Sequence, residues 1–161
     1  MADLERLFKC LAKGKVKYVL VGGVAANIHG SARLTNDIDI VYERSSRNLR
    51  NLSKALSPFN PYLRGAPPGL PFKFDEKTLK AGLNFTLTTS LGDIDLLGEL
   101  LGIGSYKATA KNALKVNLFG LNLLCIDLIG LIRSKRAAGR PKDLEAIAEL
   151  ELLLERRNKG G

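Results

Sequence analysis

Hydrophobic side chains recur along the first third of the chain at spacings that alternate between those of helices and strands. Residues 3 to 13 carry apolar side chains at helical spacing, with Asp3 placed to cap the helix and Gly14 to end it. Further on, the pattern predicts a strand, an alanine-rich helix, a second strand and a basic helix, at residues 16–21, 23–30, 37–42 and 45–56.

Residues 57 to 72 interrupt this regular order. Five of the six prolines lie there, so we expect a stiff and irregular excursion from the fold. Aromatic residues in and beside it, Phe59, Tyr62, Phe72 and Phe74, indicate that it packs against the protein. Long structured loops in compact domains often serve function.

Two hairpins follow the proline-rich segment. Residues 84–89 and 93–97 alternate apolar and polar positions on either side of a glycine turn, which predicts a pair of antiparallel strands. Residues 114–126 repeat this pattern around Gly120. The segment between the hairpins, residues 102–112, predicts only a glycine-rich turn and a short polar helix.

The last part of the chain predicts two helices. Asp127 caps the first, which runs to Ala138, and Pro141 begins the second. The core-facing positions of the second helix are expected at Leu144, Ile147, Leu150 and Leu154.

Together these elements predict an α/β (α+β) fold. Its sheet is expected to be mixed, partly antiparallel and built of about five strands, a common sheet size, with helices on its flanks. A chain of 161 residues is long enough to bury a core, so we expect one domain over residues 1–161, with a C-terminal two-helix segment at residues 127–157.

Composition adds a preference for anionic partners. Apolar content of 45% and charged content of 25% are ordinary globular values, but the formal net charge is +9. Such a charge favours a nucleotide, a nucleic acid or solvent counterions. No apolar run approaches the length of a membrane span, and the start, MADLERLFKC, carries acids where a signal peptide would be apolar, so a cytoplasmic protein without a membrane partner is expected.

The strongest candidate for a functional site lies in the stretch VLVGGVAANIHGSARLTNDIDIV, residues 19–41. Asp37 and Asp39 point to the same side of the second strand, because side chains alternate along a strand. Two neighbouring carboxylates favour a cation between them, and Mg²⁺ is usually held by one or two carboxylates together with substrate phosphates. Gly22 and Gly23, at the start of a helix, let backbone N–H groups approach a phosphate closely.

A second pair of acids, Asp93 and Asp95, lies on the first hairpin and also shares one face. Asp93 abuts the turn, where Asp is common for conformational reasons. Asp95 lies deeper between Ile94 and Leu96, where an unpaired carboxylate is harder to explain structurally. Asp95 is therefore the candidate for a third metal ligand.

Two further residues each have a functional and a structural interpretation. His29 is the only histidine, and no partner for a histidine-based mechanism is visible, so a surface or helix-end histidine is an equal alternative. Lys135 falls on the inward stripe of the helix at 127–138, where it either faces a site or extends past the helix end to solvent.

These residues resemble a family pattern. A Gly-Gly turn, a helix, Asp-x-Asp on the next strand and a third Asp on a later strand are similar to the DNA polymerase β-like nucleotidyltransferase superfamily. Arg33-x-Thr35 just before the acids, and the segment KRAAGRPKD, resemble its small toxin-type (abortive-infection-like) members. In that segment Lys135, Arg140 and Asp143 take the places of the family's Lys, Arg and Asp.

The resemblance implies an Mg²⁺-dependent nucleotidyltransferase that uses an NTP such as ATP. Asp37, Asp39 and Asp95 would hold two Mg²⁺ ions, with Mn²⁺ as a substitute, because in-line phosphoryl transfer needs charge neutralised on the entering and leaving oxygens. Nucleotide-binding roles would fall to Gly22, Gly23, Arg33, Thr35, Lys135, Arg140 and Asp143. The acceptor hydroxyl could belong to RNA or tRNA, a protein or a small molecule.

The alternative is a non-catalytic member of the same fold. It would bind a nucleotide, RNA or a protein such as an antitoxin partner, as one component of a toxin–antitoxin pair. The presence of all three carboxylates favours the enzyme. The identity of the NTP, the acceptor and the oligomeric state are left open by the sequence.

Overall fold

The computed structural model describes residues 2–160, and it contains the predicted helices in the predicted order, with two further helices between residues 57 and 81 that the sequence did not predict. The helices are α1 (Leu4–Lys13), α2 (Gly22–Ile28), α3 (Ser46–Leu56), a short 3₁₀ helix η1 (Ser57–Phe59), α4 (Glu76–Ala81), α5 (Tyr106–Ala110), α6 (Leu128–Ala138) and α7 (Pro141–Gly160). The strands are β1 (Tyr18–Val21), β2 (Ile38–Tyr42), β3 (Tyr62–Leu63), β4 (Asn84–Thr89), β5 (Gly92–Leu97), β6 (Glu99–Leu100), β7 (Gly104–Ser105), β8 (Leu114–Leu118) and β9 (Leu121–Cys125).

One mixed sheet forms the centre of the molecule. Its strand order is β3-β4-β5-β2-β1-β9-β8, and β6 pairs with β7 in a separate two-stranded sheet. Strand β2 runs parallel to β5 and antiparallel to β1, which in turn runs parallel to β9. The expected mixed α/β fold is confirmed, but the sheet has seven strands where about five were predicted. The proline-rich segment supplies one of them, the two-residue β3, which is too short to leave a periodic pattern.

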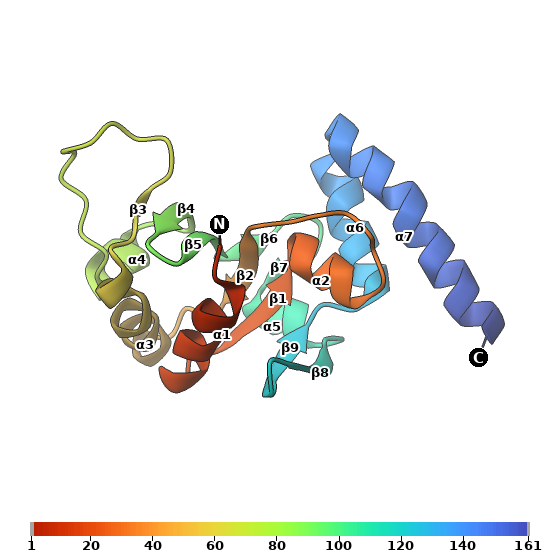
Figure 1. The fold of residues 1–161 in the computed structure, drawn as a ribbon, viewed down its shortest axis with the longest axis horizontal. Helices are drawn as coiled ribbons and strands as arrows, with labels where there is room; N and C mark the ends of the chain where they lie inside the picture. The colour runs from red at the N-terminus through yellow and green to blue at the C-terminus, as the bar shows by residue number, and fades with distance from the viewer. Residues whose placement is uncertain (1, 161) are drawn as a thin grey trace.

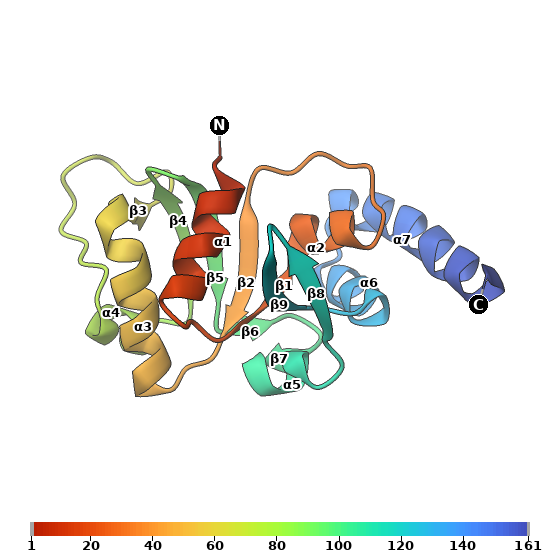
Figure 2. The same cartoon turned by 60° about the horizontal axis from the view of Figure 1, so that its bottom comes forward.

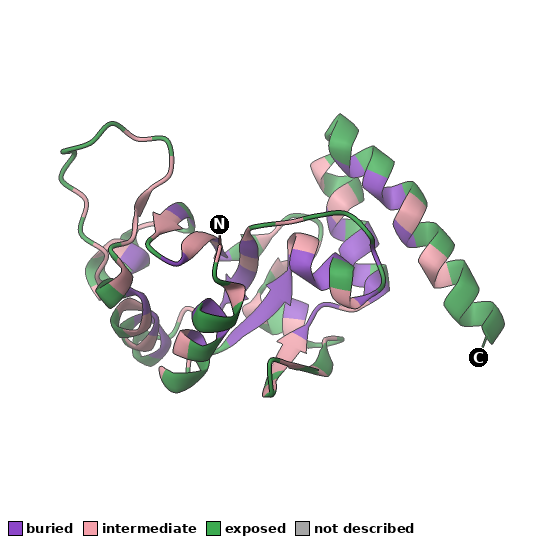
Figure 3. Cartoon of the chain, viewed as in Figure 1, coloured by how far each residue is buried: buried purple, intermediate pink, exposed green. Residues whose placement is uncertain are grey.

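Helices lie at both ends of this sheet. Figure 2 shows α1 and α3 in front of it, with α4 beside α3, whereas α6 and α7 lie beyond β1 at the other end of the molecule. The whole of β1 is buried, and so are the hydrophobic residues of β2 beside it and Ile94 and Leu96 on β5, the next strand (Figure 3). The exposed outer surface of α7 contrasts with this core. None of the helices between residues 2 and 160 combines the length and apolar character that a membrane crossing requires.

Local sequence signals set several helix ends. Asp3, Ser45 and Asp127 each accept a hydrogen bond from a backbone N–H in the first turn of α1, α3 and α6. Such caps satisfy N–H groups that have no partner within the helix. Gly139 ends α6 in the left-handed conformation, with φ of 65°.

One predicted core position is wrong. Leu144 is 56% exposed, although Ile147 and Leu150 on the same helix are buried as expected. The inward side of the first turn of α7 is taken instead by Asp143, whose side chain pairs with Arg140 and Lys135. A polar contact therefore replaces the apolar stripe at that end of the helix.

His29 is buried and ends α2, so it is a helix-end histidine and not a surface one. Its Nε2 lies 2.7 Å from the carbonyl oxygen of Ile126, and its Nδ1 lies 3.1 Å from Nη1 of Arg157. Both ring nitrogens thus have partners, and the contacts tie α7 to α2 and to the end of β9. This arrangement supports the structural interpretation of His29.

The proline-rich segment packs against the protein at its two ends and projects from it in between. Phe59 lies under the guanidinium group of Arg6, and Tyr62 contacts Phe72 edge to face at 6.2 Å. The chain between β3 and α4 then forms a wide loop that projects from the sheet (Figure 1). The expected packing of this segment therefore holds for its two ends.

Candidate active site

The sheet register brings the predicted carboxylates together. Asp39 on β2 is directly opposite Asp95 on β5, and on its other side Asp39 is opposite Val21, the last residue of β1. Gly22 and Gly23 follow Val21 and begin α2. Two carboxylates and the glycine turn, which are far apart in the sequence, therefore meet at one place on the sheet.

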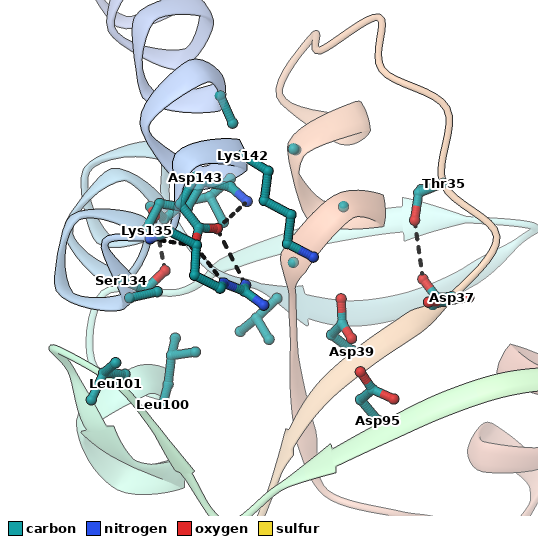
Figure 4. A pocket seen from close by; sticks show the side chains of 18 of the residues that line it. Thr35, Asp37, Asp39, Asp95, Leu100, Leu101, Ser134, Lys135, Lys142 and Asp143 are labelled. Carbon is teal, nitrogen blue, oxygen red and sulfur yellow. Dashed lines mark hydrogen bonds and ion pairs between the residues drawn. The ribbon is translucent and has the colours of Figure 1, made fainter. Parts of the chain in front are cut away.

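A cavity of about 550 Å³ opens at this place, between the sheet, α2, α6 and the start of α7 (Figure 4). All the residues to which the sequence assigned a role line it: Gly22, Gly23, Arg33, Thr35, Asp37, Asp39, Asp95, Lys135, Arg140 and Asp143. Its size falls in the range of small-molecule sites, which measure roughly 300–1,000 Å³.

The glycines are needed for the approach of Asp39. Gly22 has φ of 71°, a left-handed conformation that favours glycine, and a Cβ there would overlap the Asp39 carboxylate, lying 2.7 Å from its Cγ. A Cβ at Gly23 would lie 2.7 Å from Oγ1 of Thr35. The backbone of Gly23 lowers the pKa of Asp39, against the larger effect of burial. The glycine pair therefore makes room for the Asp39 carboxylate and for Thr35.

The carboxylates repel one another in the absence of a cation. Burial, then the neighbouring Asp95 and then Asp37 raise the pKa of Asp39 to about 7. In residues 2–160 no three His, Cys, Asp or Glu side chains are already gathered as ligands around one point. A divalent ion between Asp39 and Asp95 would remove the repulsion, so the chemistry of these groups fits a hard cation with oxygen ligands.

This repulsion predicts that stability depends on pH and on metal. The raised pKa means that folded Asp39 keeps a proton that the unfolded chain releases, so the free energy of unfolding falls as pH rises from about 4 to about 7. In EDTA we expect a loss of roughly 1–4 kcal/mol over this window, and at pH 8 Mg²⁺ should restore part of it. Thermal unfolding at several pH values tests this, with Asp39→Asn as the variant that should lose both effects. The prediction would be contradicted if the free energy of unfolding changed with pH equally in wild type and in Asp39→Asn.

Two basic residues, Lys135 and Arg140, form a basic wall across the cavity from the carboxylates. Asp143 is 4% exposed and accepts hydrogen bonds from Nε of Arg140 at 2.7 Å and from its backbone N–H at 3.2 Å. Nζ of Lys135 lies 3.9 Å from the other oxygen of Asp143. These contacts lower the pKa of Asp143, the hydrogen bond from Arg140 foremost. Asp143 therefore orients both Lys135 and Arg140 at the cavity.

The sequence analysis missed Lys142. This residue lines the cavity, and Figure 4 shows its side chain extending from the start of α7 toward Asp39. Its position one residue before Asp143, in a run of basic residues, was the available signal.

The loop that carries Arg33 and Thr35 is tied to α7. Glu149 accepts hydrogen bonds from Oγ of Ser31 at 2.6 Å and from the backbone N–H of Ala32, and Arg33 lies 3.8 Å from the same carboxylate. Arg33 and Thr35 thus line the cavity from a loop held by a residue more than a hundred positions away in the sequence.

Arg64 was also missed. It leaves β3 and contacts both hairpin acids, with Nη2 at 2.8 Å from Oδ1 of Asp95 and Nε at 3.1 Å from Oδ2 of Asp93. Asp93 lies within β5 and not in the turn itself, so turn conformation alone does not account for this residue.

Comparisons with known proteins bear on the fold. No protein-family model and no curated protein sequence matches this chain. Among solved structures, it is similar to the crystal structure of TM1012 from Thermotoga maritima, a protein provisionally described as a nucleotidyltransferase. The TM-score is 0.58 at 15% sequence identity, over 91% of this chain and 88% of that one. The two proteins share a mixed α/β fold.

Proposed function

We propose that this protein transfers a nucleoside monophosphate from an NTP to an acceptor hydroxyl and releases pyrophosphate. The acceptor oxygen forms a bond to the α-phosphorus, and the bond from that phosphorus to the bridging oxygen of the β-phosphate breaks. The observation that carries the proposal is the juxtaposition of Asp39 and Asp95 beside a glycine turn, with Lys135 and Arg140 across a cavity of about 550 Å³. The shared fold is consistent with this chemistry.

The residues divide into an acidic side and a basic side. Asp37, Asp39 and Asp95 would hold Mg²⁺, or Mn²⁺ in its place, and bound ions of this kind neutralise charge on the entering and leaving oxygens. Asp95 would accept the proton of the acceptor hydroxyl. Lys135, Lys142 and Arg140 would bind the triphosphate, with the N–H groups at the start of α2 beside them.

RNA is the acceptor that the surface favours. Three surface cavities adjoin one another. Each pair of them shares one lining residue: Lys17, Glu43 or Tyr106. In the part of the chain that the structure describes, Glu43 is the single acid in these walls, and it lies 3.7 Å from Nζ of Lys17. The basic residues there are Lys15, Lys17, Arg44, Arg47, Lys107, Lys111 and Lys115. Such a surface suits a phosphate backbone.

The experiment that tests this function follows the label from an NTP. The protein is incubated with Mg²⁺ and each α-labelled NTP, together with cellular RNA, protein or small molecules. Label in RNA is expected, and Asp39→Asn should abolish it. Label in protein would replace RNA as the acceptor. Nucleotide binding without any transfer would favour the non-catalytic alternative, including a toxin–antitoxin component.

Lys135→Ala tests the basic side. The Lys135 side chain is 21% exposed and lines the cavity, so its loss should raise the KM for NTP about tenfold by removing one charged contact to phosphate. The melting temperature should change little, because its contact with Asp143 is long and Arg140 still pairs with that acid. Steady-state kinetics and thermal unfolding on one preparation measure both. A lower melting temperature with unchanged KM would assign Lys135 a structural role.

A further inference from the structure

Arg64 is held in place from several directions. Its backbone N–H donates to the carbonyl of Thr86 at 3.0 Å, which extends the pairing of β3 with β4 by one residue. Its Nη2 donates to the carbonyl of Leu87 at 2.7 Å and to Asp95 at 2.8 Å. Nε is buried and meets Asp93 as an ion pair without hydrogen-bond geometry. A long side chain fixed at both ends in this way has little freedom to leave Asp95.

Arg64 approaches Asp95 from the side away from the cavity. Within residues 2–160, Asp95 lines the cavity, whereas Arg64 and Asp93 do not. Oδ1 of Asp95 is occupied by Arg64, which leaves the second oxygen for Asp39 or for a cation. Asp93 has no contact with the cavity and serves as the second anchor of the guanidinium group.

We propose that Arg64 is a positioning residue that sets the orientation of the Asp95 carboxylate toward the metal and the acceptor hydroxyl, and that Asp93 holds Arg64 for this task. The inference rests on the proposed function. It explains why the proline-rich segment packs at its start, because that packing delivers Arg64 to the sheet. It also explains the pair of acids two residues apart on β5: Asp95 faces the cavity, and Asp93 holds the guanidinium group of Arg64.

A purely structural tie between β3 and β5 would have different consequences. Arg64 contributes a positive charge directly beside a metal ligand, so its removal makes the acidic cluster more negative. A divalent cation should then bind more tightly, although Asp95 is less well oriented. A structural tie predicts the opposite, a loss of metal binding and activity in parallel with stability.

The test compares Arg64→Gln, Arg64→Lys and Asp93→Asn with wild type. Mn²⁺ affinity is measured by electron paramagnetic resonance without nucleotide, and transfer rates are measured separately. Arg64→Gln should tighten Mn²⁺ binding about threefold or more and lower kcat about tenfold or more, with a smaller change in KM for NTP. Arg64→Lys keeps the charge but not the planar fork, so it should keep the wild-type Mn²⁺ affinity and still lose turnover.

Asp93→Asn should lower kcat a few fold, and in combination with Arg64→Gln it should add nothing, since both act through one contact. Arg6→Gln is the control, because the guanidinium group of Arg6 lies over Phe59 in the same segment and, among residues 2–160, forms no ion pair with a carboxylate. An Arg64→Gln protein with wild-type Mn²⁺ affinity overturns the inference, as does a parallel loss of metal binding and melting temperature. Absence of transfer by wild type counts against the proposed function instead, and the Mn²⁺ comparison still decides the role of Arg64.

Discussion

Asp95→Asn protein should bind NTP and yet transfer the nucleotide at least about a hundredfold more slowly than wild type. The substitution keeps the shape of the side chain but removes the charge that would hold the metal and receive the acceptor proton. Asp39 and the basic wall remain, so nucleotide binding should fall much less than turnover. Rates at saturating NTP, with binding measured by calorimetry, separate the two quantities.

Two comparisons make this prediction specific. Asp39→Asn should lose transfer to a similar extent, because Asp39 is the direct neighbour of Asp95 in the sheet. Asp75→Asn is the control: it removes one acid at the N-terminus of α4, where Asn also caps well, and it lies outside the cavity. If Asp93→Asn abolished transfer while Asp95→Asn kept the wild-type rate, the assignment of the catalytic acid would be wrong.

Gly22→Ala should abolish transfer even though it adds only a methyl group. A Cβ at this position would overlap the Asp39 carboxylate, so Asp39 must leave its place opposite Asp95. The residue also has φ of 71°, which costs about 1–2 kcal/mol for a residue with a side chain. We expect a loss of turnover about as large as that of Asp39→Asn, with a moderately lower melting temperature.

Gly120→Ala separates the two contributions in Gly22→Ala. Gly120 has φ of 78° in the β8–β9 turn, and a Cβ there would meet no atom within 4 Å. It should therefore lose stability through the same backbone strain and keep the wild-type rate of transfer. An active Gly22→Ala protein would show that the Asp39 carboxylate can move without loss of function, against the proposed site.

Most of the elements, and the acidic residues of the candidate site, could be predicted from the sequence alone. Helix ends at Asp3, Ser45 and Asp127 were predictable because capping depends on residues a few positions apart. Asp37 and Asp39 were predicted to lie together because side chains alternate along a strand, a local rule; both line the cavity, although Asp37 precedes β2. Arg140 and Asp143 were predicted only through the family resemblance. Periodicity placed Lys135 on the inward stripe of its helix, but it also placed Leu144 wrongly in the core.

Only the tertiary structure decided which distant groups meet. The choice between Asp93 and Asp95 depends on the register of β5 against β2 and on Arg64, which reaches both acids from a segment without regular periodicity. The contact of Glu149 with Ser31 joins residues 118 positions apart. Such pairings depend on how the sheet and the helices pack together. The free energy that selects them comes from burial and from electrostatic contacts between elements, and local conformational preferences do not contain it.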